Sequence, residues 1–149
     1  MTDGCYACTH SAAPEAPPRD QVVRTALWRA AHADRTGLPG WLVLVPLRHV
    51  TSLDQLTAEE SAEIGPLLAG LTAALRQVTG CVKTYVLLLA EKEGFSHLHF
   101  HVVPRAPDLA AELVGPGILA LLHSDDPVPD AEQDRLAALL GAAMPTTRA

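Results

Sequence analysis

The chain lacks long hydrophobic runs, has few basic residues and holds only three cysteines. No apolar stretch approaches the roughly 20 residues that cross a bilayer. Lys and Arg number 11 against 17 Asp and Glu, a net charge of −6, which disfavours long nucleic acid but not a single nucleotide. An odd cysteine count without a signal peptide argues against a disulfide framework. We therefore expect a soluble, cytoplasmic protein with no membrane partner.

The length and composition fit one domain with one core. Hydrophobic residues make up 48% of 149, and the sequence has neither repeats nor a sharp boundary. We predict a single domain over 1–149. Within it, 1–20 forms an N-terminal loop, of which 11–20 are rich in Pro and Ala, and 106–149 form a C-terminal extension with a helix.

Several segments have the composition of strands. Residues 21–35 fit either a short helix or a strand pair, and we favour the strands. Residues 41–45 predict a strand that Pro46 ends. Residues 84–90 predict a buried strand, which the next predicted strand, 97–103, can pair with as an antiparallel hairpin.

Two helices complete the pattern. Thr57 with Glu60 fits a capping box that begins a helix ending near Gly80, with Pro66 expected to kink it. A last helix follows Pro129, with Asp130 as its cap, and one of its faces carries Leu136, Leu139, Leu140 and Met144. The order of elements predicts an α+β fold, with helices packed on an antiparallel sheet.

Residues 94–105, GFSHLHFHVVPR, place three histidines at alternate positions. On a strand, His97, His99 and His101 would share one face while their neighbours face the core. A solvated face is one explanation. Metal binding or phosphoryl chemistry is favoured, because imidazole acts as ligand, base and nucleophile near neutral pH. One ion held by all three histidines is disfavoured, because alternate residues on a flat strand lie too far apart.

This motif matches at every position the pattern of the histidine triad (HIT) family, His-φ-His-φ-His-φ-φ with φ apolar. Residues 40–50, GWLVLVPLRHV, also resemble the family's segment of glycine, strand, proline, basic residue and histidine. The resemblance runs roughly from Cys5 to Arg105. It implies a homodimeric α+β domain with a sheet of about five strands, the HIT-like fold. It also implies a nucleotide hydrolase or nucleotidyl transferase that acts at an α-phosphate through a covalent nucleotidyl-histidine.

The resemblance also implies residue roles. His99 would attack phosphorus, and His101 would contact phosphate oxygens, with Ser96 and Arg105 as further substrate-binding residues. Nucleoside phosphoramidates and dinucleoside polyphosphates are the implied substrates. The loop before the triad is shorter than in many members, and Trp41 stands where a histidine is common. The alternative is therefore a non-catalytic nucleotide-binding or regulatory module.

Cys5 and Cys8 form a CxxC motif, which alone fits a redox pair or two unrelated thiols. A second CxxC is missing, which excludes a conventional zinc ribbon. The chain is similar to a bacterial subset of the family with a zinc site, and this implies the ligands Cys5, Cys8, His49 and His97. Two thiolates and two imidazoles suit a structural, tetrahedral Zn²⁺. His10 is a rival fourth ligand.

Overall fold

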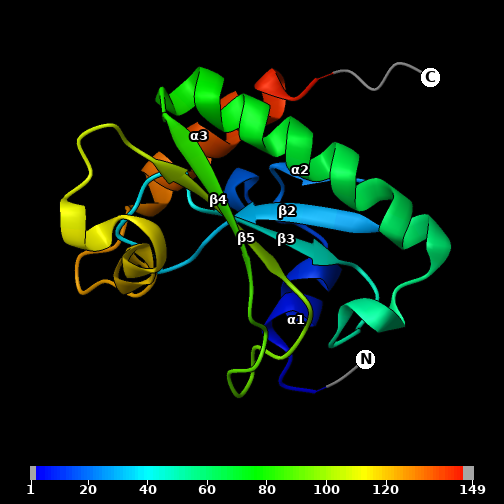
Figure 1. Ribbon diagram of the computed structural model, residues 1–149. Coiled ribbons are helices and arrows are strands. Elements are labelled where there is room, and N and C mark those ends of the chain that lie inside the picture. The colour runs from blue at the N-terminus through cyan, green and yellow to red at the C-terminus, as the bar shows by residue number, and fades with distance from the viewer. Residues whose placement is uncertain (1–2, 146–149) are drawn as a thin grey trace.

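The computed structural model describes residues 3–145 and forms one five-stranded antiparallel sheet (Figure 1). The strands lie in the order β1-β2-β3-β5-β4. Their bounds are β1 Val23–Arg24, β2 Trp28–His32, β3 Leu42–Pro46, β4 Lys83–Leu88 and β5 Phe100–Arg105. The predicted α+β fold is confirmed, including the strands chosen for 21–35 and the antiparallel pair β4–β5.

Helix α2, Ala58–Thr79, has the predicted ends. The Thr57 hydroxyl accepts from the Glu60 N–H at 3.1 Å, and the Glu60 carboxylate accepts from the Thr57 N–H at 2.8 Å. Gly80 ends the helix with φ +70°, where glycine costs least. The helix continues through Pro66. The other helices are α1 Tyr6–Ala12 and α3 Asp130–Ala143, with 3-10 turns η1 Pro18–Asp20, η2 Leu53–Gln55, η3 Ala111–Leu113 and η4 Gly115–Leu121.

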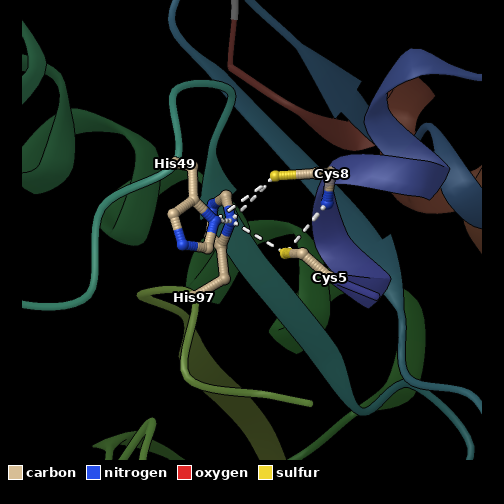
Figure 2. A group of neighbouring side chains, drawn as sticks. All are labelled: Cys5, Cys8, His49 and His97. Carbon is tan, nitrogen blue, oxygen red and sulfur yellow. Dashed lines mark hydrogen bonds between the residues drawn. The ribbon is translucent and has the colours of Figure 1, made fainter. Parts of the chain in front are cut away.

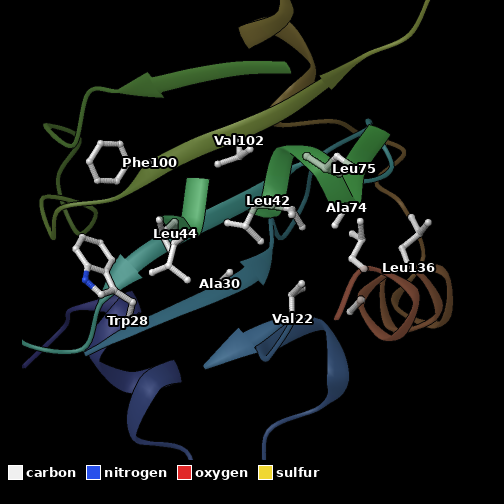
Figure 3. Close-up of a cluster of buried hydrophobic side chains, with 14 of the residues drawn as sticks. Val22, Trp28, Ala30, Leu42, Leu44, Ala74, Leu75, Phe100, Val102 and Leu136 are labelled. Atoms are coloured by element: carbon white, nitrogen blue, oxygen red, sulfur yellow. The ribbon is translucent and has the colours of Figure 1, made fainter. Parts of the chain in front are cut away.

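The main core lies between one face of the sheet and helices α2 and α3 (Figure 3). Alternation along the strands sends every second side chain into this core. The members from the sheet are Trp28, Ala30, Leu42, Leu44, Phe100 and Val102. Their neighbours, including His99 and His101, therefore belong to the opposite face.

A second, smaller cluster covers part of that opposite face. Ala33, Trp41, Val103 and Ile118 form its buried centre, with Ile118 contributed by η4. The Tyr85 hydroxyl accepts from the Gly115 N–H at 3.0 Å and ties the C-terminal extension to β4. The extension thus covers one part of the histidine face and leaves the rest to a cavity.

Two strand predictions need correction. Strand β5 begins at Phe100, because the Leu98 N–H donates to the Val50 carbonyl at 2.8 Å and draws 97–99 toward the loop after β3. Strand β4 ends at Leu88, before Ala90 adopts a positive φ of 51°. It is not buried as predicted, because it is the edge strand and each of its residues is exposed or half-buried.

Two further corrections concern the ends of the chain. The predicted N-terminal loop contains helix α1, whose first turn Cys5 caps by accepting from the Cys8 N–H at 3.4 Å. Pro129, not Asp130, is the N-cap of α3, and it offers no side-chain cap. Leu139 lies on the solvent side of α3 and is 45% exposed. The predictions for residues 1–2 and 146–149 lie outside the described residues.

Within residues 3–145, no helix is long and apolar enough to cross a membrane.

Candidate active site and metal centre

Cys5, Cys8, His49 and His97 converge from three distant segments of the chain (Figure 2). Their ligand atoms all lie within 4.8 Å of one another. Cys8 Sγ is 3.4 Å from His49 Nδ1 and 3.5 Å from His97 Nδ1. Cys5 Sγ is 3.5 Å from His97 Nδ1, and the two Nδ1 atoms are 3.2 Å apart.

The four shortest separations, 3.2–3.5 Å, are close to the edges of a tetrahedral zinc site. Bonds of about 2.3 Å to sulfur and about 2.0–2.1 Å to nitrogen imply ligand-to-ligand edges of roughly 3.3–3.8 Å. Two sulfurs and two imidazole nitrogens are also the donor set that zinc prefers. The cluster is therefore compatible with a structural zinc ion, as the resemblance to zinc-containing family members implied.

The ring of His97 is oriented for this cluster by the backbone. Its Nε2 lies 2.8 Å from the Pro46 carbonyl, which can only accept, so Nε2 carries the proton and Nδ1 keeps its lone pair for the metal. Burial lowers the pKa of His97, the Pro46 hydrogen bond opposes this, and His49, His99 and Arg29 lower it further. A neutral ring is the form that binds a metal.

His10, the rival ligand, lies elsewhere. Its ring stacks on Tyr6 with centroids 3.9 Å apart, and its Nδ1 donates to the Tyr6 carbonyl at 2.9 Å. It does not belong to the four-residue cluster.

An ion pair anchors the loop that carries His49. Arg48 donates to both carboxylate oxygens of Glu60, at 3.0 and 2.8 Å. Glu60 is buried and sits in the capping box of α2. The hydrogen bonds from Arg48 hold the pKa of Glu60 below its usual value, against the opposing effect of burial. The residue before His49 is thereby fixed to the start of α2.

The backbone orients the ring of His99. Its Nδ1 lies 2.7 Å from the His97 carbonyl, so Nδ1 must carry the proton. The lone pair is then on Nε2. His99 is half-buried and lines the cavity described below.

His101 has the opposite arrangement. Its Nδ1 lies 3.0 Å from the indole Nε1 of Trp41, which donates to it. The rings of His99 and His101 meet edge to face, with centroids 4.9 Å apart. Burial lowers the pKa of His101 to about 4, with His99 and His123 also lowering it. His101 is therefore neutral at physiological pH.

A cavity of about 390 Å³ opens over the three histidines. Residues from α1, β2, β3, the loop 89–95 and the C-terminal extension line it. The sequence predictions placed Ser96 and Arg105 at the substrate, but neither lines this cavity. Ser96 is exposed, and Arg105 lies at the far end of β5 opposite Lys83.

Other residues of the cavity were not predicted from the sequence. Arg29 is buried on β2, with Nε donating to the Ser11 hydroxyl at 3.0 Å and a terminal nitrogen donating to the Asp20 carbonyl at 2.9 Å. Tyr6 and Phe95 bring aromatic rings 5.5 Å apart to the cavity. Strand alternation could have placed Arg29 on the histidine face of the sheet, because its neighbour Trp28 faces the main core and adjacent strand residues point to opposite faces. Tyr6 and Phe95 carry no comparable signal.

A family model described as HIT domain matches residues 15–108. This range includes the histidine motif and His49 but begins after Cys5 and Cys8. No curated protein matches the chain.

Solved structures of histidine triad proteins share the fold. A zinc-bound histidine triad family protein from Mycobacterium smegmatis is 20% identical, with a TM-score of 0.68, 93% of this chain covered and 91% of that chain. A hypothetical histidine triad nucleotide-binding protein from Sulfolobus tokodaii strain7 is 12% identical, with a TM-score of 0.70 and the same coverages. A uridylyltransferase is 24% identical, with a TM-score of 0.63, 93% of this chain covered and 44% of that chain.

Proposed function

The chain belongs to the histidine triad (HIT) family, and from this we propose that it is a nucleotide hydrolase or nucleotidyl transferase acting at an α-phosphate. The observation that carries the proposal is the hydrogen bond from His99 Nδ1 to the His97 carbonyl. It leaves the Nε2 lone pair of His99 available to the cavity, as a nucleophile requires.

The proposed reaction has two displacements. In the first, the Nε2 lone pair of His99 forms a bond to the α-phosphorus, and the bond from phosphorus to the leaving nitrogen or oxygen breaks with its electron pair. The leaving group takes up a proton. In the second, water or another acceptor attacks phosphorus, loses a proton, and the P–N bond to His99 breaks. The covalent intermediate divides one difficult step into two easier ones.

His101 supports this reaction by contacting phosphate oxygens. It lies beside His99 in a buried position, where a hydrogen bond to developing negative charge is stronger than in water. His101 is thus proposed to stabilise the transition state, and His99 to form the covalent bond.

The cavity suits a nucleotide in size and lining. Its volume of about 390 Å³ lies in the range of small-molecule sites. The rings of Tyr6 and Phe95 offer faces on which a base can stack. Asp34 also lines the cavity and offers a carboxylate for ribose hydroxyls. Nucleoside phosphoramidates and dinucleoside polyphosphates are the substrate classes that we propose.

Zinc has a structural role in this proposal. Cys5, Cys8, His49 and His97 would hold the ion, and when bound it supplies cross-linking of the N-terminal segment to the sheet. His97 lies two residues before His99, so the same ligand that binds the metal positions the carbonyl that orients the nucleophile.

We also propose that the protein is a homodimer that pairs through strand β4. This strand lies at the edge of the sheet, with Val86 on the strand 43% exposed and Val82, just before it, 47% exposed. An apolar edge strand favours pairing with a second copy.

Turnover by a His99→Ala variant tests the proposed activity. An adenosine phosphoramidate and a dinucleoside polyphosphate are the substrates, with product release followed by chromatography. We expect the variant to lose several orders of magnitude in rate, as is typical when a covalent nucleophile is removed. It should retain zinc, because His99 is outside the metal cluster. An unchanged rate would refute the mechanism.

The alternative function is a nucleotide-binding module without turnover. The loop 89–96, which is shorter than in many members of the family, favours it. Tight binding of AMP or GMP by wild-type protein, with no hydrolysis or transfer of either substrate class, would support this alternative.

A further inference from the structure

Trp41 and His101 form a buried side-chain hydrogen bond on the histidine face of the sheet. The indole Nε1 and the imidazole Nδ1 are 3.0 Å apart, and the two rings lie at 88°. Trp41 is fully buried and His101 is 6% exposed. We propose that Trp41 is a positioning residue, which fixes His101 in the tautomer that presents Nε2–H to the substrate.

The chemistry of indole gives this bond one direction. The indole nitrogen is a donor only, so Nδ1 of His101 must accept. A neutral imidazole with an accepting Nδ1 carries its proton on Nε2. The other tautomer, or an imidazolium, would place two N–H groups against each other in a buried site, which is costly.

The surroundings keep the indole in place. Trp41 packs with Ala33, Val103 and Ile118 in the smaller core cluster, beneath the C-terminal extension. Its backbone is also fixed, because the Ala33 N–H donates to the Trp41 carbonyl at 2.8 Å. The donor therefore has a defined position relative to His101.

His99 and His101, whose rings are neighbours, have different hydrogen-bonding roles. His99 presents a lone pair on Nε2, whereas His101 presents an N–H. His101 is then a hydrogen-bond donor to a phosphoryl oxygen and not a base. This catalytic meaning rests on the proposed function, but the tautomer does not.

Nitrogen-15 NMR of histidine-labelled, zinc-loaded protein without substrate tests the tautomer directly. We expect His101 Nε2 to have the shift of a protonated nitrogen and Nδ1 that of an unprotonated acceptor. The opposite assignment in wild-type protein would overturn the proposal, and this result needs no variant to fold.

Trp41→Phe removes the donor and keeps an aromatic ring. We expect the His101 signals to shift toward a mixture of tautomers. Trp28→Phe is the matched control, since Trp28 is equally buried and its indole donates to the Glu60 carbonyl at 3.0 Å, on the other face of the sheet. The control should leave the His101 signals unchanged. A wild-type tautomer in Trp41→Phe would contradict the role of Trp41.

Kinetics then separate this inference from the proposed function. With an adenosine phosphoramidate, Trp41→Phe should lower kcat by about tenfold or more with little change in KM, since a hydrogen bond to developing charge is weakened. An unchanged kcat, with turnover intact, would overturn the positioning role in catalysis. If wild-type protein shows the expected tautomer but turns over neither substrate class, the proposed function fails while the assignment of the tautomer by Trp41 stands.

Discussion

Replacing Cys5 with serine removes one of the two sulfur ligands of the metal cluster, and we expect this change to release zinc and unfold helix α1. The helix has only seven residues, and none of them is buried. Isolated helices of this length are unstable in water. The ligands Cys5 and Cys8 therefore attach the first turn of α1 to the sheet, while Ser11 in its last turn accepts from Arg29 on β2 at 3.0 Å.

The size of the effect follows from binding linkage. A ligand present at about 100 to 1,000 times its Kd stabilises the folded state by about 2.7–4.1 kcal/mol. For a chain of this size, each kcal/mol corresponds to about 2–4 °C in Tm. We therefore expect Cys5→Ser to lower Tm by roughly 5–16 °C under zinc-replete conditions.

The assay combines zinc content, thermal unfolding and hydrogen exchange. Wild-type protein should hold one zinc per chain, and Cys5→Ser should hold much less. The amides of α1 should lose protection from exchange, whereas those of α2 should not. Other contacts of the N-terminal segment, such as the Arg19–Asp134 ion pair at 2.9 Å, should remain.

Two control variants make the result specific. Cys81→Ser changes a buried cysteine in the main core, so it should destabilise the protein but keep its zinc. His10→Ala removes the rival ligand and should also keep zinc. Wild-type protein without zinc under reducing conditions, or full zinc occupancy in Cys5→Ser, would refute the reasoning.

Further predictions concern acid stability, the His49 loop and assembly. The pKa of His101 is lowered to about 4, so the unfolded state binds a proton below about pH 6.5 that the folded state does not. Stability should fall as pH drops from about 6.5 to about 4, less steeply in His101→Phe, measured by denaturant unfolding with zinc content checked at each pH. Glu60→Gln should lower the free energy of unfolding in urea by about 1–3 kcal/mol, because it weakens the buried acceptor of the Arg48 hydrogen bonds. A variant as stable as wild-type protein would contradict this. Sedimentation should give twice the chain mass for wild-type protein and a monomer for Val86→Lys; a wild-type monomer would contradict the proposed dimer.

The local chemistry of the sequence predicted much of the fold. The capping box at Thr57 and the glycine that ends the helix at position 80 depend only on residues within one or two turns of each helix end. The structure contains both of these features. The strand predicted over 97–103 instead spans Phe100–Arg105. Its start differs because the hydrogen bond from the Leu98 N–H to the Val50 carbonyl joins residues distant in sequence. Helix α1 was missed because none of its seven residues is buried, so no periodic hydrophobic pattern marks it in the sequence.

The candidate site likewise contains some residues that could be predicted from the sequence and others that could not. The four residues of the metal cluster were implied by the resemblance to the zinc-containing subset of the family, and the structure brings them together. The cavity residues Tyr6 and Phe95 depend on how separate segments meet, which spacing along the chain does not encode. The bond between Trp41 and His101 joins residues 60 apart, so the sequence motif alone could not reveal it.

The central claim is that His99 forms a covalent bond to the nucleotide. Its most direct test is mass spectrometry of wild-type protein quenched in acid-free denaturant during turnover of an adenosine phosphoramidate, followed by peptide mapping. The account predicts one nucleotidyl group per chain, on His99, and none in His99→Ala. A nucleotidyl group on another residue, or turnover by His99→Ala at the wild-type rate, would contradict it.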